Sequence, residues 1–425
     1  MVPLARVRLH CSHPSRHVKA LIASFRANAI YAAAVLALLL TAAYSPAQPT
    51  RSMVFHPTDP QNAVAFDHFY NLEFDAAIRE FQQIVDRHPN DPFAVNHLLT
   101  GVLFQELYRM GALNTGDYAN DSFVGKPHRP ADPKVSQRIR DLVDHASKLE
   151  EDRLGQNSKD VDALYARGVT RAQFSTYTAL IERAWFSALR NAVGARRDHE
   201  RVLELSPGYT DAKLIVGAHN YVMGSLPWGV KVAVSVVRLS GSKQVGLDYL
   251  KDAANGNGET SIDAKILLAL FLRREHQFAE ALTYTRSLIP TYPRNVLLAL
   301  EEGNLLRADG KLSEATSVYR RIWQAGREGK YPGLHYEFAA LSLGDTLRAQ
   351  KDYAGAASAF DDVSHAENPD PEVVQRADLS AGEMYDLLQK RDLALKKYQA
   401  VIASKSDNDN ADLARKRLKE PYRED

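Results

Sequence analysis

The sequence predicts an all-α fold, a solenoid built from a stack of antiparallel helix pairs. The first observation is an internal repeat, because Ala269 and Ala281 are followed 34 residues later by Gly303 and Ala315. Within each pair the two small residues lie 12 positions apart, which places them in consecutive helices. The second observation is the length: 425 residues exceed what one compact core usually holds, whereas units that contact only their neighbours can be stacked without that limit.

A period of 34, with a small residue midway along a first helix and an alanine early in a second, is typical of tetratricopeptide repeats (TPRs). The pattern recurs along the chain and predicts a right-handed TPR-like α-solenoid of about eight helix pairs. An aromatic residue follows the second small residue by four positions in several units, as at Tyr319, Phe360 and Tyr398. The paired small residues are Ala65 with Ala77, Gly101 with Ala146, Gly168 with Ala195, Gly217 with Gly246, Ala269 with Ala281, Gly303 with Ala315, Gly344 with Ala356 and Gly382 with Ala394.

Units 2 to 4 depart from this spacing. Their paired residues lie 45, 27 and 29 positions apart instead of 12, so these units carry 33, 15 and 17 extra residues. We expect the extra residues at the turn between the two helices of each unit. A further insertion, a glycine-rich joint from Gly326 to Gly333, separates units 6 and 7.

The predicted organisation has five parts. Residues 1–47 form an export signal and residues 48–57 a polar lead. Residues 58–260 form the N-terminal TPR-like units, residues 261–407 the regular units, and residues 408–425 a capping helix and tail. The run from Asp407 to Asn410 lacks the glycine and the later glutamate of a calcium-binding loop, so we interpret it as a helix N-cap.

The first 47 residues have the pattern of an export signal. Five basic residues precede Ala27, an apolar run extends from Ala29 to Ala43, and Ser45-Pro46-Ala47 supplies small residues for cleavage. This pattern predicts an exported protein of the periplasm or cell envelope. Two alternatives remain, a retained membrane anchor through residues 27–50 and a mitochondrial transit peptide. The single cysteine, Cys11, lies in this segment, so we expect no disulfide in a mature chain.

The sequence offers no catalytic constellation, and we expect neither enzyme activity nor a cofactor. It contains no H-E-x-x-H, no G-x-S-x-G and no phosphate-binding glycine loop followed by Ser or Thr. The eleven histidines outside the first 47 residues include no i, i+4 pair of the kind that binds metal on a helix. Without the first 47 residues, 48 basic side chains stand against 52 acidic ones, a balance that argues against a nucleic-acid partner.

An unusually apolar stretch extends from Leu226 to Gly241. Its only charged residues, Lys231 and Arg238, form one narrow polar stripe with Ser235 at helical spacing. The stretch predicts a helix wedged between repeats or, as the alternative, a helix that contacts a membrane surface.

The residues around this stretch resemble the central signature of the tetratricopeptide domain 39 proteins. The resemblance covers about Asp162 to Asp252, and its motifs are Gly217-Ala-His-Asn220, Ser225-Leu226-Pro227, Gly241-Ser242 and Gly246-Leu247. It implies a helical scaffold that is associated with membranes or lipid bodies in some members, with no known catalytic residues. The export segment departs from that family.

The clearest functional signal is a row of arginines. In a TPR-like solenoid the first helices line the concave face, and the residue near the end of this helix is Arg273, Arg307 and Arg348 in three consecutive units. Guanidinium groups stacked at that spacing suit acidic peptide groups or a terminal carboxylate. The alternative is that cations simply lie favourably at helix C-termini. The candidate ligand-binding residues are Arg273, Arg274, Asn304, Arg307, Arg348 and Tyr221.

Two further points bear on this groove. The lysines expected of a carboxylate clamp are here replaced by Ile266, Leu300 and Leu341. Arg79, in the second helix of the first unit, is expected on the outer side of the solenoid.

The sequence therefore predicts a non-catalytic protein-interaction scaffold of the cell envelope, with a protein or peptide partner in the concave groove. The alternative is a membrane-associated lipid-handling or trafficking adaptor that uses the apolar helix at 226–241. The sequence specifies neither the partner nor the oligomeric state.

Overall fold

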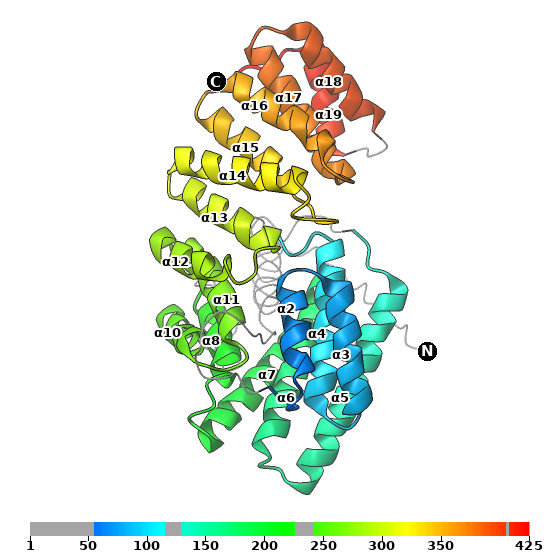
Figure 1. The fold of residues 1–425 in the computed structure, drawn as a ribbon, viewed down its shortest axis with the longest axis vertical. Helices are drawn as coiled ribbons and strands as arrows, with labels where there is room; N and C mark the ends of the chain where they lie inside the picture. Colours follow the sequence, from blue (N-terminus) through cyan, green and yellow to red (C-terminus); the bar gives the residue numbers. More distant parts are fainter. Residues whose placement is uncertain (1–54, 115–128, 226–240, 405–407, 425) are drawn as a thin grey trace, which may run out of the picture.

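The computed structural model describes residues 55–114, 129–225, 241–404 and 408–424, and these residues fold into α-helices without a strand (Figure 1). The helices are α2 (Gln61–Tyr70), α3 (Phe74–Arg87), α4 (Pro92–Arg109), α5 (Pro133–Gln156), α6 (Val161–Leu180), α7 (Trp185–Leu205), α8 (Ala212–Ser225), α10 (Lys243–Asn255), α11 (Ser261–Arg274), α12 (Phe278–Leu288), α13 (Val296–Ala308), α14 (Leu312–Arg327), α15 (Glu337–Ala349), α16 (Tyr353–Asp362), α17 (Pro371–Leu387), α18 (Arg391–Ala403) and α19 (Asp409–Lys419).

The helices form the predicted right-handed TPR-like α-solenoid, and the fold class is confirmed. Each unit is an antiparallel pair, and successive units stack along the chain (Figure 1). The eight pairs are α2 with α3, α4 with α5, α6 with α7, α8 with α10, α11 with α12, α13 with α14, α15 with α16, and α17 with α18. Helix α19 covers the last pair, and the Asn408 side chain caps it by accepting hydrogen bonds from the backbone N–H groups of Asn410 and Ala411.

The repeat pattern has a direct packing cause in the last three units. A Cβ added to Gly303 would lie 2.4 Å from the Tyr319 ring, and the corresponding distance from Gly344 to Phe360 is also 2.4 Å. The first helix therefore needs glycine where the aromatic ring of the second helix lies against it. This contact explains why a small residue and an aromatic recur together in the sequence.

The insertion in unit 3 is not at the turn, and this part of the sequence prediction is wrong. Helix α6 has 20 residues and α7 has 21, and only residues 181–184 connect them. The extra residues extend both helices because residues 161–206 contain no proline, so nothing in the sequence stops the first helix early. The apolar stretch of unit 4 lies outside the described residues except for Gly241.

Units 1 and 2 pack back against the last four units. The contacts lie near the N-terminal ends of α11, α13 and α15, on the side away from Arg273, Arg307 and Arg348 (Figure 1). They are hydrogen bonds from Tyr70 Oη to Asp263 Oδ1 (2.9 Å), from Asn295 Nδ2 to the Tyr70 carbonyl (2.7 Å) and from the His335 N–H to Tyr108 Oη (3.1 Å), with an ion pair from Arg294 to Glu73 (2.5 Å). The solenoid thus covers part of its own inner face with its first two units.

Candidate functional site

The three arginines lie where the sequence predicts, in the last turns of α11, α13 and α15. We call Arg273, Arg307 and Arg348 the arginine row. A cation at this position interacts favourably with the negative end of the helix dipole. The row therefore exists as a structural feature, and its partners decide what it can bind.

Each arginine of the row forms an ion pair with a carboxylate on the first helix of the next unit. The row consequently ties neighbouring units together, a role that the sequence prediction did not include. The pairs are Arg273 with Glu301 at 3.1 Å, Arg307 with Asp345 at 3.9 Å, and Arg348 with Glu383 at 3.2 Å.

The first member of the row is buried. The side chains of Arg273 and Glu301 are 8% and 5% exposed, and Glu301 also accepts a hydrogen bond from Asn304 Nδ2 at 3.5 Å. Asn304 Oδ1 accepts a hydrogen bond from Tyr319 Oη at 2.8 Å. Arg273 and Asn304 are thus neighbours in one buried network that an incoming ligand would have to break, and loss of one partner from a buried ion pair is strongly destabilising.

The middle of the row is open to solvent. Asp345 is shared by Arg307 and by Arg376 of α17, which lies 2.9 Å from the same carboxylate oxygen. The Arg307 and Arg376 side chains are 35% and 52% exposed. Two guanidinium groups share one carboxylate here, so this group of three side chains carries a net charge of +1 at an accessible surface.

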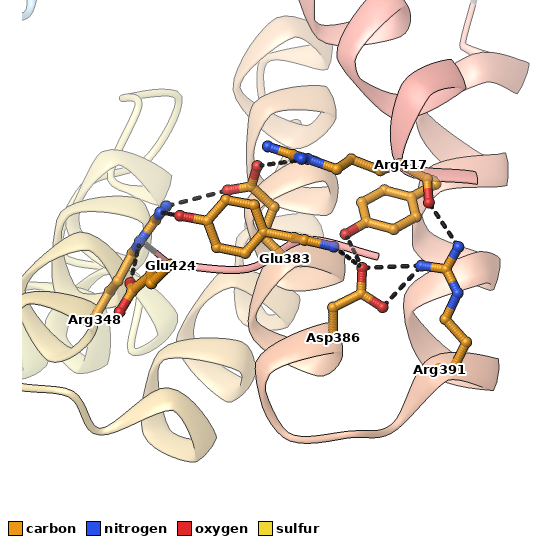
Figure 2. A network of polar contacts seen from close by, with 8 residues as sticks. Arg348, Glu383, Asp386, Arg391, Arg417 and Glu424 are labelled. Carbon is orange, nitrogen blue, oxygen red and sulfur yellow. Dashed lines mark hydrogen bonds and ion pairs between the residues drawn. The ribbon is translucent and has the colours of Figure 1, made fainter. Parts of the chain in front are cut away.

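The end of the row is occupied by the C-terminal tail (Figure 2). Arg348 forms an ion pair with Glu424 at 3.5 Å and donates a hydrogen bond to Tyr422 Oη. Glu383 is shared by Arg348 and, at 3.6 Å, by Arg417 of α19. Burial works against the charged form of Arg348, but Tyr422, Glu383 and Glu424 outweigh it and raise the pKa of this guanidinium.

Tyr221 and Arg274 belong to the joint between units 4 and 5 and not to the row. Tyr221 is fully buried, its ring stacks on Phe271 with centroids 3.7 Å apart, and its hydroxyl donates to Glu275 Oε1 at 2.8 Å. Burial and the Glu275 carboxylate raise the pKa of the Tyr221 phenol. Burial lowers the pKa of Arg274 to about 10, although Glu275 opposes the shift. Neither residue meets Arg307 or Arg348 in a described contact.

Arg79 is exposed on α3, the second helix of the first unit, and its surroundings are not a plain outer surface. It lines a cleft of about 760 Å³ between units 1 and 2 and the loop before α15, together with Arg109, Arg294 and His335. The cleft exists because units 1 and 2 fold back on the later units, which a local repeat pattern does not reveal. Arg79 is therefore unsuitable as a control for binding at the arginine row.

Sequence reasoning missed the acidic partners of the row and the tail. Arg376, Arg417, Tyr422 and Glu424 all contribute, yet none of them stands at a repeated position. The available signal was the carboxylate at 345 and at 383, one residue after the glycines of units 7 and 8.

The described residues contain neither of two further kinds of feature, a metal-binding cluster or a membrane-spanning helix. Among them, no group of three or more His, Cys, Asp and Glu side chains is arranged to hold a metal ion. None of the helices in the same ranges combines the length and the apolar character needed to cross a bilayer.

No protein-family model matches the sequence, and no curated protein matches it. Several solved structures share the fold. The Cut9–Hcn1 hetero-tetramer of the APC/C aligns over 84% of this chain and 54% of its own, at 13% identity and a TM-score of 0.42, so this chain spans about half the length of that one. The human IFIT1 dimer with m7Gppp-AAAA aligns over 84% of this chain and 79% of its own, at 13% identity and a TM-score of 0.38. A tetratricopeptide repeat protein from Parabacteroides merdae aligns over 77% of this chain and 99% of its own, at 14% identity and a TM-score of 0.31.

The helix pairs and their stacking define the class of this protein, a TPR-like α-solenoid. The extended inner surfaces of such solenoids provide their binding sites.

Proposed function

We propose that the protein is a non-catalytic interaction scaffold of the cell envelope that binds an acidic segment of a partner protein at the exposed part of the arginine row. The observation that carries this proposal is the sharing of Asp345 by Arg307 and Arg376. A second carboxylate, supplied by a partner, would complete the charge balance of this group.

The chemistry of the two side chains supports an acidic partner. A guanidinium presents paired N–H donors that match the two oxygens of a carboxylate. The Arg307 guanidinium lies 3.9 Å from the Asp345 carboxylate, so a partner's carboxylate could approach it more closely than Asp345 does. Arg376, at 2.9 Å from Asp345, is already at a close ion-pair distance. We do not propose a nucleic-acid partner, because carboxylates alternate with the arginines along the row.

Location in the cell envelope rests on the export pattern of residues 1–47, which lie outside the described residues. Fusion of residues 1–60 to a reporter enzyme that is active only after export tests it. The proposal expects reporter activity and loss of the segment by cleavage after Ala47. An inactive, cytoplasmic reporter would contradict the location without affecting the binding proposal.

Selection from a display library of random peptides tests the binding proposal directly. We expect peptides enriched in Asp and Glu on the wild-type chain, and loss of that enrichment on an Arg307→Glu and Arg376→Glu double variant. The matched control is Arg320→Glu, an exposed arginine of α14 on a second helix. Enrichment of peptides without acidic residues, or equal enrichment on the double variant, would contradict the proposal.

A second candidate function is the membrane-associated lipid-handling or trafficking adaptor that the resemblance to the tetratricopeptide domain 39 proteins suggests. One observation favours it: a Cβ on Gly241 would lie 2.6 Å from Met223 Cβ and 2.5 Å from the Asn220 carbonyl. Gly241, which follows the apolar stretch, therefore packs against the last turns of α8, which ends at Ser225 directly before that stretch. Liposome flotation that is abolished by Val234→Asp in a folded chain would favour the adaptor, and no flotation of the wild type would exclude it.

A further inference from the structure

The last residues of the chain lie on a site built by α15, α17 and α19. The Tyr422 N–H donates a hydrogen bond to Asp386 Oδ2 at 2.8 Å. Two guanidinium groups lie close to the Tyr422 ring, with Arg348 Cζ 5.2 Å and Arg417 Cζ 4.6 Å from its centroid. Both distances are within the range of a cation–π interaction. The tail is thus held through its backbone, its ring and its hydroxyl.

The tail contacts this site through every second residue. Glu424 forms the ion pair with Arg348 and accepts a hydrogen bond from Tyr353 Oη at 2.7 Å. Tyr422 is half-buried, whereas Pro421, Arg423 and Glu424 are exposed. In an extended segment alternate side chains point in opposite directions, so Tyr422 and Glu424 face the site together while Arg423 faces away.

The site is organised by contacts that do not involve the tail (Figure 2). Arg391 forms an ion pair with Asp386 at 2.8 Å and donates to the carbonyls of Arg417 and Leu418 at 2.7 and 2.9 Å. Tyr398 Oη also donates to Asp386 at 2.8 Å. These bonds hold α17 and α19 in place up to Leu418, so the site would keep its shape if the residues after Glu420 left it.

Removal of the tail would leave a cationic site. Arg348 and Arg417 would then share the Glu383 carboxylate. The Glu424 carboxylate supplies the second negative charge in the present arrangement. An external segment would have to offer the same features as the tail, an aromatic residue followed two positions later by a carboxylate.

We propose that this site is a docking site for an extended partner segment with a Tyr-x-Glu pattern, and that the chain's own tail occupies it as an internal competitor. The inference rests on the proposed function, because Arg348 belongs to the same arginine row. The tail is tethered a few residues from its site, and a tethered ligand acts at a millimolar effective concentration. A partner segment therefore binds only after it has displaced the tail.

The test measures binding of a fluorescein-labelled peptide with the sequence of residues 418–425 by fluorescence anisotropy. A chain that ends at Glu420 should bind this peptide about tenfold or more tightly than the full chain. A full-length Tyr422→Ala and Glu424→Ala double variant frees the site without shortening the chain and should bind it as the truncated chain does. Absence of binding by both altered chains, with unchanged circular dichroism melting, would overturn the proposal, and so would equal binding by the full chain.

Matched variants assign the binding to the site. Peptides with alanine at the position of Tyr422 or Glu424 should bind the truncated chain about tenfold more weakly, whereas alanine at the position of Arg423 should change little. On the protein, Arg348→Ala should abolish binding and Arg320→Ala should not. Equal losses for all three peptides would overturn the pattern. That result would not affect the selection of acidic peptides by Arg307 and Arg376 in the display experiment, so each proposal can be contradicted without the other.

Discussion

Units 2 and 3 of this solenoid fill one repeat position with different chemistry from the last three units. Four residues after the small residue of the second helix, units 6 to 8 carry Tyr319, Phe360 and Tyr398, each of them buried. The same position is Glu150 in unit 2 and His199 in unit 3, and both are also buried. The helix pairs keep their register although an aromatic ring has been exchanged for an ionisable side chain.

The consequence of the exchange is a polar interior in units 2 and 3. Glu150 Oε1 accepts a hydrogen bond from Thr170 Oγ1 at 2.5 Å, and Thr170 lies 2.8 Å from Asn96 Oδ1. His199 occupies the space beside Gly168, where an added Cβ would lie 2.1 Å from its ring. In unit 6, by contrast, the Tyr319 ring fills the space beside Gly303, and only its hydroxyl forms a hydrogen bond, to Asn304. Backbone register is therefore set by the small residue, and the residue opposite it sets the polarity of the core.

Unit 5 shows an intermediate case. Its residue at this position is Thr285, and a cavity of about 80 Å³ lies beside it, between α2, α4 and α11 to α13. The cavity lining is mostly apolar, with Ala269 of α11 and Leu288 of α12 next to Thr285. Where the smaller Thr285 stands in place of the aromatic ring, the space is not completely filled.

The largest expected effect is at the aromatic contact. Gly303→Leu should lower the free energy of unfolding by about 3 kcal/mol, because its Cβ alone would lie 2.4 Å from the Tyr319 ring. Chemical denaturation followed by circular dichroism measures the change. The control is Gly155→Leu in α5, where an added Cβ meets nothing within 4 Å and the substitution should be neutral or slightly stabilising. If both variants unfolded with the wild type, the register assigned to unit 6 would be wrong.

The second effect tests the polar interior through its pH dependence. Burial raises the pKa of the Glu150 carboxyl to about 7 from 4.5, although a hydrogen bond from Thr170 opposes the shift. The folded chain therefore keeps a proton that the unfolded chain releases, so this group stabilises the fold at low pH and the stabilisation is lost as the pH rises through 7. Relative to the wild type, Glu150→Gln should gain roughly 2.5 kcal/mol in unfolding free energy between pH 5 and pH 8.

His199 provides the opposing control for that experiment. Burial lowers the pKa of this imidazole to about 4, so its contribution to stability rises with pH between 4 and its ordinary value of 6.5. His199→Phe should remove that rise and make unit 3 resemble units 6 to 8. A Glu150→Gln variant whose stability followed the wild type in parallel from pH 5 to pH 8 would contradict the assignment of a buried, protonated Glu150.

The smallest effect concerns unit 5. The Thr285 hydroxyl is buried and has no hydrogen-bond partner among the described residues. Thr285→Val keeps the shape and removes the polar atom, so it should stabilise the chain by about 1 kcal/mol. Thermal unfolding compared with that of Thr283→Val, an exposed threonine whose hydroxyl donates to the Ala279 carbonyl, measures it. Destabilisation by Thr285→Val would indicate a partner for this hydroxyl.

The sequence predicted those features that depend on local spacing. The eight helix pairs, the recurrence of small residues with aromatics in the last units, and the positions of Arg273, Arg307 and Arg348 all follow from the repeat spacing. Local spacing also predicted cations at helix ends, since each helix terminus attracts charge independently of its neighbours.

The remaining features depend on contacts between distant residues. Tyr70 and Asp263 are 193 positions apart, and Arg348 and Tyr422 are 74 apart. Whether an arginine is exposed depends on where such distant segments lie, so the burial of Arg273 and the occupation of Arg348 could not be read from the repeat. The helical insertion of unit 3 was missed for a different reason, because extra residues without proline extend a helix as readily as they form a loop.

The most direct test of the account is the affinity of a display-selected acidic peptide for single variants of the row. Arg307→Ala should weaken binding by about 1.4 kcal/mol, or tenfold, and Arg307→Lys should recover only part of the loss because it keeps the charge without the paired donors. Arg320→Ala should leave the affinity unchanged. Equal losses at Arg307 and Arg320 would mean diffuse charge attraction and would contradict a binding site at the arginine row.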